Sequence, residues 1–204
     1  MSPLDANEHG LALHAAYSDA ADPGDWTYLP YGPFLHESEF VAWLNTIESE
    51  SDPAFYSIVD LGTGAAAGLA SHLRIDPSSA SIEVGHIHMA RCLQRTAAAT
   101  EAMYLMMSRA FSSGYRRYEW KCDALNAPSR SAAARLGFTY EGTFRQATHY
   151  KGRNRDTAWF SILDAEWPAL EREFERWLEP GNFDGDGEQK SPLRMTNEIQ
   201  RPAG

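Results

Sequence analysis

The chain has 204 residues, of which 43% are hydrophobic and 12% aromatic, a composition typical of one globular domain with a full core. Its formal net charge of −10 argues against a general nucleic-acid binder, because non-specific binding to phosphate backbones requires clustered Lys and Arg. No apolar run is long enough for a membrane span and no secretory signal is visible, so we expect a cytoplasmic protein without a membrane partner.

Hydrophobic periodicity predicts the elements of the first half of the chain. An apolar run over residues 8–17 precedes an aromatic loop, 22–34, in which Pro and Gly prevent regular structure. Apolar residues at helical spacing then predict a helix over 36–50. Three further segments have the composition or alternation of strands, and they cover 54–61, 65–75 and 82–89.

The second half alternates between helices and strands. A helix is predicted over 91–114, where Gly114 supplies the stop. We predict the remaining strands at 115–122, 138–150 and 156–163, and the remaining helices at 126–137 and 166–178. This order predicts an α/β fold. The folded domain is expected over 1–179, and the polar composition of 180–204 indicates a tail.

Near its start the predicted helix 91–114 reads QRTAAAT, in which only threonines and alanines, with little side-chain bulk, follow Arg95. A strand that runs into such a helix presents free backbone N–H groups and the positive end of the helix dipole to an anion. The hydroxyls of Thr96 and Thr100 can add hydrogen bonds, and Arg95 adds a mobile positive charge. The alternative is that the alanines only let the helix pack closely against the sheet.

Several motifs, in this order, resemble the GNAT superfamily of acyl-CoA-dependent N-acyltransferases, and within it the RimJ/RimL-type branch. They are IEVGHIHM, LQRTAAATEA, NAPSRSAAARLGF, YEG and GRNRDTAWFSIL, and the resemblance covers about residues 25–178. It implies a mixed, twisted sheet flanked by helices, whose fourth and fifth strands splay apart and leave a slot for the pantetheine arm. It also implies acetyl transfer from acetyl-CoA, as a co-substrate and without a metal, to a primary amine in a ternary complex.

The resemblance assigns the pyrophosphate of the cofactor to a loop with the pattern Gln/Arg-x-x-Gly-x-Gly/Ala. The residues that match this loop and the turn after it are Gln94, Arg95, Thr96, Ala97, Ala98, Ala99 and Thr100. Ala97 therefore stands at the first glycine of the pattern. If its φ is helical, its N–H still points toward the phosphate and only the gap narrows.

The resemblance also assigns roles at the start of the predicted helix 126–137. Asn126 would hydrogen-bond the cofactor arm, and Ser129 would protonate the leaving thiolate. Many family members carry a tyrosine seven residues after this Asn, but here that position is Ala133. Both Asn126 and Ser129 also fit ordinary roles in a helix start.

The remaining catalytic roles have several candidates. Backbone N–H groups at Ile87, His88 and Met89 are candidates for stabilising the oxyanion. The general base is open among four residues, Glu83, His86, His88 and His149. His86 and His88 lie two apart on one strand, but no third ligand stands at a metal-binding spacing, so we expect no metal.

The acceptor cannot be identified from the residues. Trp26 and Tyr31 are candidate walls of its pocket, although such aromatic residues more often belong to a core. KGRNRD predicts a hairpin turn with Arg155 and Asp156 paired, or else a basic rim for the acceptor or a phosphate. A protein N-terminus or a small amine both fit as acceptor, and a homodimer stays open. Two other classes also stay open: an acyl-CoA-binding module without turnover, and a plain protein-interaction domain.

Overall fold

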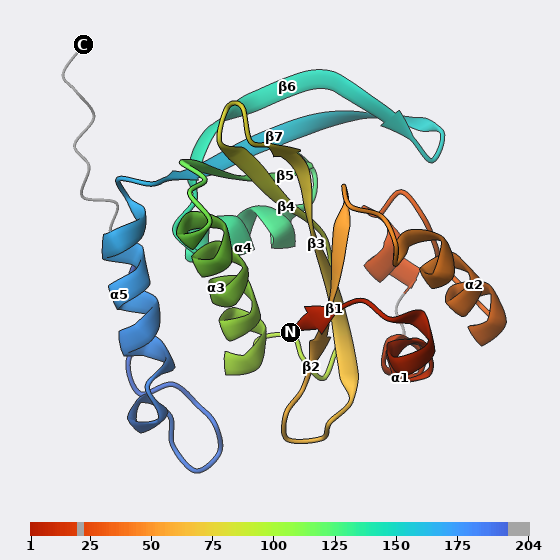
Figure 1. Cartoon of the computed structure of the whole chain (residues 1–204), viewed down its shortest axis with the longest axis horizontal. Coiled ribbons are helices and arrows are strands. Elements are labelled where there is room, and N and C mark those ends of the chain that lie inside the picture. The colour runs from red at the N-terminus through yellow and green to blue at the C-terminus, as the bar shows by residue number, and fades with distance from the viewer. Residues whose placement is uncertain (20–22, 196–204) are drawn as a thin grey trace. The chain divides into compact units, whose positions relative to one another are not determined.

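The computed structural model describes residues 1–19 and 23–195. The described residues form five α-helices and seven strands, drawn in Figure 1. The helices are α1 (Ala6–Ser18), α2 (Glu37–Ile47), α3 (Ala97–Ser112), α4 (Ala127–Arg135) and α5 (Trp167–Leu178). The strands are β1 (Ser2–Pro3), β2 (Ala54–Val59), β3 (Ala66–Asp76), β4 (Ser81–Met89), β5 (Arg117–Asp123), β6 (Thr139–Tyr150) and β7 (Arg153–Leu163). The predicted α/β class is confirmed.

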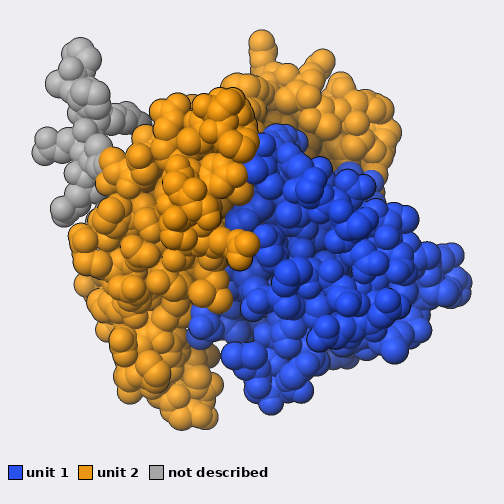
Figure 2. Space-filling view, viewed as in Figure 1, with its two compact units in different colours: residues 1–75, 83–102 blue, residues 76–82, 103–204 orange. Residues whose placement is uncertain are grey.

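The chain divides into two compact units, coloured separately in Figure 2. The first unit holds residues 1–75 and 83–102, and its strands follow the order β1-β2-β3-β4. β2 pairs antiparallel with both β1 and β3, so that Ser57 lies opposite Ser2 on one side and Leu69 on the other. β3 is buried along most of its length, as expected for a strand with neighbours on both edges.

Helices α1 and α2 belong to the first unit and pack against each other. Asp5 caps α1, because its carboxylate accepts hydrogen bonds from the N–H groups of Asn7 and Glu8, both at 2.9 Å. The contact with α2 is close at Gly10, where an added Cβ would lie 3.0 Å from a methyl group of Val41. A glycine in this helix therefore allows the two helices to approach.

The second unit holds residues 76–82 and the chain from 103 onward, and its strands follow the order β5-β7-β6. β5 and β7 pair antiparallel, from Arg117 opposite Leu163 to Asp123 opposite Thr157. Period-two alternation divides β5 into two faces, as predicted from the sequence. The apolar face consists of Tyr118, Trp120 and Cys122, all buried.

Helices α3, α4 and α5 contribute the rest of the second unit's core. Trp167 of α5 stacks on Phe111 of α3, with ring centroids 4.9 Å apart. Phe138, directly after α4, contacts the rings of both Tyr118 and Trp120. The core of this unit therefore lies between its three strands and these helices.

The predicted hairpin is present, with Tyr150 of β6 opposite Arg153 of β7, but the ion pair predicted in it is not. β7 already begins at Arg153, so Arg155 and Asp156 are successive strand residues whose side chains point to opposite faces. Asp156 instead accepts a hydrogen bond from the backbone N–H of Gln146 at 2.7 Å. The predicted pairing of Arg155 with Asp156 is wrong for this reason.

The first part of the expected tail is structured. Residues 180–182 form a 3-10 turn, and Phe183 then pairs with Gln189 in an isolated bridge. The segment is tied back to α5, since Trp177 donates to Gln189 at 2.7 Å and the N–H of Arg194 donates to Glu173 at 2.6 Å. Polar composition therefore did not prevent residues 180–195 from following the surface of α5.

Candidate active site

The segment between β4 and α3 is a tight turn and not the first part of the helix. The prediction of a helix from residue 91 is wrong, because α3 begins at Ala97. Arg95 has a left-handed backbone, with φ +63°, which a right-handed helix cannot contain. Gln94 ties the turn to the preceding strand by donating its side-chain amide to the carbonyl of Met89 at 3.0 Å.

Thr96 caps α3. Its Oγ1 accepts a hydrogen bond from the N–H of Ala99 at 3.1 Å and donates to the carbonyl of Leu93 at 2.7 Å. The hydroxyl is thus engaged in the cap of the helix. Thr100 is buried, and its hydroxyl contacts the carbonyl of Thr96 at 3.4 Å.

The N–H groups of Ala97 and Ala98 belong to the first turn of α3, where helical backbone N–H groups have no partner within the helix. Ala97 is itself helical, so the left-handed residue of the turn is Arg95 and not the residue at the family's glycine position. Alanine therefore fits this position without backbone strain. The turn combines unbonded N–H groups, the positive helix end and the charge of Arg95, which together suit an anion.

β4 presents His86 and His88 to an aromatic cluster in the first unit. His88 stacks on Tyr17, with ring centroids 4.0 Å apart, and lies edge-on to Trp26 at 4.2 Å. His86 lies almost parallel to Tyr31, and the Tyr31 hydroxyl is 3.1 Å from Nδ1 of the imidazole. The structure therefore pairs His88 with Trp26 and His86 with Tyr31, which are four of the predicted site residues. About sixty residues of sequence separate the two partners of each pair.

The two histidines are neutral at neutral pH. Burial lowers the pKa of His86 to about 4, and the charge of Arg74 acts in the same direction. Burial likewise lowers the pKa of His88 to about 4, against an opposing effect of Asp25. His86 also has a left-handed backbone, with φ +51°, and non-glycine residues in that conformation are concentrated at functional sites.

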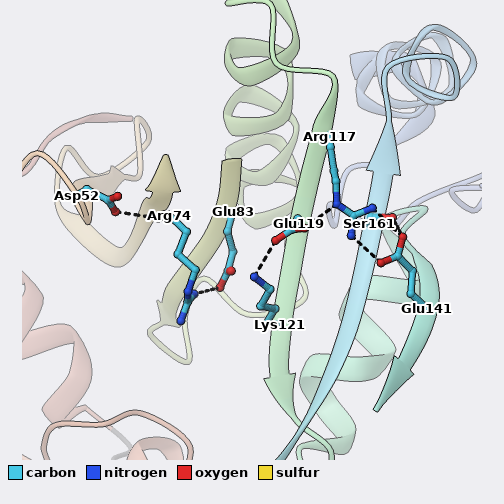
Figure 3. Close-up of polar contacts among 8 residues, drawn as sticks. All are labelled: Asp52, Arg74, Glu83, Arg117, Glu119, Lys121, Glu141 and Ser161. Atoms are coloured by element: carbon cyan, nitrogen blue, oxygen red, sulfur yellow. Dashed lines mark hydrogen bonds and ion pairs between the residues drawn. The ribbon is translucent and has the colours of Figure 1, made fainter. Parts of the chain in front are cut away.

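Glu83 lies on β4 and is buried against a cation. Its carboxylate accepts a hydrogen bond from Arg74 at 2.6 Å, while the Arg74 side chain is 61% exposed (Figure 3). The backbone N–H of Arg74 donates to Asp52 at 2.8 Å, which positions the arginine. Glu83 is thus engaged with a cation inside the first unit.

In the second unit, Asn126 and Ser129 lie at the start of α4. Asn126 caps the helix by accepting a hydrogen bond from the N–H of Ser129 at 3.1 Å. The Oγ of Ser129 accepts a hydrogen bond from Trp120 Nε1 at 3.0 Å, so its own hydroxyl acts as a donor, and in this structure the acceptor is the sulfur of Cys122. Burial raises the pKa of the Cys122 thiol, and Ser129 opposes this shift through a hydrogen bond. Ala133 is fully buried in the same helix.

His149 is exposed, lies near the end of β6 and pairs with Asn154 of β7. The sequence interpretation missed a buried cluster near it, in which Asp123 accepts from Tyr150 at 2.9 Å and pairs with Arg153 at 2.7 Å. Burial alone raises the pKa of Asp123, but hydrogen bonds from the Leu125 N–H, Tyr150 and Arg153 outweigh it and hold the pKa below its usual range.

Within residues 1–19 and 23–195, no group of three or more His, Cys, Asp or Glu side chains is arranged to hold a metal ion. No helix in the described part of the chain has the length and apolarity needed to cross a membrane.

The sequence-family model of the acetyltransferase (GNAT) domain matches residues 3–139 of the chain. The chain belongs to the GNAT acetyltransferase family. A crystal structure of a GCN5-related N-acetyltransferase from Brucella melitensis is 47% identical, with a TM-score of 0.90, and the match covers 94% of this chain and 87% of that one. An uncharacterized N-acetyltransferase, p20, from Bacillus licheniformis is 27% identical over 72% of this chain and 84% of its own length.

These matches identify the protein as an N-acetyltransferase, a member of a family whose enzymes use acetyl-CoA. Membership of the RimJ/RimL-type branch depends on the similarity to RimL itself. The crystal structure of RimL, a ribosomal L7/L12 alpha-N-protein acetyltransferase, is 21% identical with a TM-score of 0.65, and the match covers 78% of this chain and 86% of that one. At this identity the likeness extends to the fold alone.

Proposed function

We propose that this GNAT enzyme transfers the acetyl group of acetyl-CoA to a primary amine by direct attack in a ternary complex, in the manner of the RimJ/RimL-type branch. The observation that carries the proposal is the start of α3. The left-handed Arg95 and the cap at Thr96 leave the N–H groups of Ala97 and Ala98 at the positive end of a sixteen-residue helix. This arrangement supports pyrophosphate binding at residues 94–100.

The amine must lose a proton as it attacks the thioester, and we propose His86 as the group that accepts it. Its pKa of about 4 keeps the imidazole neutral at pH 7, and contact with Tyr31 orients the ring. A base with so low a pKa cannot deprotonate a free ammonium efficiently. It is suited to accept the more acidic proton that the nitrogen carries once the bond to carbon forms. Backbone N–H groups of residues 87–89 are proposed for the oxyanion.

Ser129 is proposed as the donor of the proton that the departing thiolate takes. Because Trp120 donates to the Ser129 oxygen, the serine hydroxyl is oriented as a donor. Asn126 is proposed to contact the cofactor arm in addition to capping α4. Trp26 and Tyr31 are proposed as acceptor-side residues, with Trp26 the more deeply buried of the two. A cytoplasmic location and a catalytic domain over residues 1–179 also remain proposals.

Binding of CoA to the α3 turn tests the proposal. CoA at a hundredfold excess over its dissociation constant is expected to stabilise the protein by ~2.7 kcal/mol. Ala98→Asp places a carboxylate where the pyrophosphate is proposed to lie, so the CoA affinity should fall at least ~10-fold, a loss of ~1.4 kcal/mol. An acidic residue in a first helical turn is normally mildly stabilising, so the fold should persist.

Ser38→Asp is the matched control, because Ser38 is exposed in the first turn of α2. This variant has the same added charge and should bind CoA as the wild type does. Isothermal titration calorimetry measures both affinities. An Ala98→Asp affinity within about threefold of the wild type, less than ~1 kcal/mol, would show that the phosphate is not at this turn.

A further inference from the structure

The face of the second unit's strands that lies away from the apolar core carries a row of polar residues. In β7 these are Arg155, Thr157, Trp159 and Ser161, which alternate along the strand and therefore share one face. Asp123 of β5 pairs with Thr157 and belongs to the same face. Hydrogen bonding divides this face into two halves.

The half nearer the start of β5 is satisfied internally. Arg117 bonds to Glu119 at 2.6 Å and to both carboxylate oxygens of Glu141, and Ser161 donates to Glu141 at 2.6 Å (Figure 3). Lys121 pairs with the second oxygen of Glu119 at 2.7 Å. The cations and carboxylates of this half are therefore matched to one another.

The other half contains three buried polar atoms that bond to no other group of the described chain. They are Nε of Arg155, Oγ1 of Thr157 and Nε1 of Trp159. Thr157 is only 5% exposed. A buried polar atom without a hydrogen bond destabilises a protein and is uncommon in native structures. Three of them at alternate positions of one strand indicate a surface that is completed by a ligand.

The chemistry of these atoms indicates what the ligand carries. All three groups are hydrogen-bond donors, and Trp159 is held in place between the Lys121 ammonium, 3.7 Å from its ring, and the stacked ring of Phe144. Arg153 is neutralised by Asp123 at 2.7 Å. The guanidinium of Arg155 has no carboxylate within ion-pair distance in the described residues and lies 5.9 Å over the ring of Tyr150. One uncompensated positive charge beside two neutral donors suits a carboxylate.

The position of the donors separates them from the proposed cofactor arm. Ser129 bonds to Trp120, which belongs to the apolar face of β5, whereas Thr157 and Trp159 belong to the opposite face of the paired strand. A molecule bound to the three donors is therefore not the arm held at Ser129. The second reactant in the proposed ternary complex is the amine.

We infer that Arg155, Thr157 and Trp159 bind the acceptor, and that the acceptor is an amine bearing a carboxylate, such as an amino acid or a short peptide. Arg155 and Thr157 bind the carboxylate. Arg155 and Trp159 lie about 13.6 Å apart along the strand, so in an acceptor that has a second oxygen, such as the peptide carbonyl of glycylglycine, Trp159 bonds that oxygen. This inference rests on the proposed function for the role of the bound molecule, although the binding can be measured without turnover.

The indole N–H of Trp159 gives a direct readout of binding by NMR of the ¹⁵N-labelled protein, with its resonance identified from Trp159→Phe. The probes are L-lysine, L-serine and glycylglycine, each matched with its neutral carboxamide. At least one carboxylate probe is expected to shift the indole resonance in a saturable manner, at least ~10-fold more tightly than its amide. No shift with any carboxylate probe, or equal binding of the amides, overturns the inference.

Two variants test the residues, and one serves as the control. Arg155→Gln is expected to weaken carboxylate binding ~10- to 100-fold, while Arg145→Gln, at an exposed arginine of the same hairpin, leaves it unchanged. Thr157→Val removes a hydroxyl with no partner in the described chain, so the melting temperature should stay equal or rise while binding weakens up to ~10-fold. A lower melting temperature with unchanged binding would assign Thr157 a structural role and overturn its part in the site.

Acetylation of the same probes, followed by thiol release from acetyl-CoA, separates this inference from the proposed function. If carboxylate amines bind but none is acetylated, the carboxylate-binding site stands, but the inference that the bound molecule is the acceptor is overturned. If cadaverine, which lacks the carboxylate of lysine, is acetylated with the same kcat/KM as lysine, the reaction stands and the carboxylate site is overturned.

Discussion

The two buried histidines of β4 predict how the stability of the protein depends on pH. Both have a pKa of about 4 in the folded state, against 6.5 for an ordinary histidine. Because folding disfavours the charged form of these histidines, their contribution to the free energy of unfolding is fully present above the unfolded pKa of about 6.5. This contribution is lost as the pH falls from about 6.5 through about 4, and it changes no further below about 4. Each histidine is expected to remove ~2 kcal/mol at about pH 5, so the pair removes ~4 kcal/mol.

His88→Phe isolates one of these contributions. A phenyl ring preserves the stacking on Tyr17 and the contact with Trp26, and it eliminates Nδ1, which is buried and bonds to no described group. The variant should therefore be at least as stable as the wild type at about pH 7.5, and should lose ~2 kcal/mol less on going to about pH 5.

Urea unfolding at the two pH values measures these losses, with comparable slopes required at both. His149→Gln, at the exposed end of β6, controls for the removal of a histidine as such and should behave as the wild type does. If His88→Phe and the wild type lose the same free energy within ~0.5 kcal/mol, burial does not hold His88 in its neutral form and the reasoning is refuted.

Two further variants examine single contacts. Ser129→Ala is expected to lower kcat ~100-fold with CoA affinity unchanged, because a proton donor to the thiolate acts in the transition state. An unchanged kcat at saturating substrates would show that Ser129 is only a helix-start residue. Arg74→Met removes the hydrogen bond to the buried carboxylate of Glu83 and should destabilise the protein by ~2 kcal/mol in urea unfolding. Arg116→Met, at an exposed arginine bonded to a backbone carbonyl, is its control, and equal stability of the two variants would contradict the importance of the ion pair.

Local patterns in the sequence predicted most elements of this fold. The alternation in YRRYEWKC corresponds to β5, and Asn126 with Pro128 marks the start of α4, where Asn126 is the cap. These features depend on neighbouring residues, since strand alternation, capping and the conformational limits of proline act over a few positions. The order of the family motifs identified the GNAT family for the same reason, because each motif is contiguous.

The start of α3 shows where prediction from neighbouring residues fails. The segment RCLQRT has no proline or glycine to end the helical pattern, yet Arg95 turns into the left-handed region and α3 begins only at Ala97. The cap at Thr96 and the tie from Gln94 to Met89 stabilise this turn. The tie to Met89 depends on where β4 ends, a tertiary contact that can override local helix propensity.

The sequence by itself determined the fold class, the family and the set of residues from which a site must be built. Only the tertiary structure decided which of them meet. Tyr31 reaches His86 across 55 positions, Asp123 reaches Tyr150 across 27, and the donors of β7 are buried without a partner in the described chain. Burial and charge neighbours set the pKa values and leave donors unsatisfied, and both are properties of three-dimensional packing that no spacing along the chain contains.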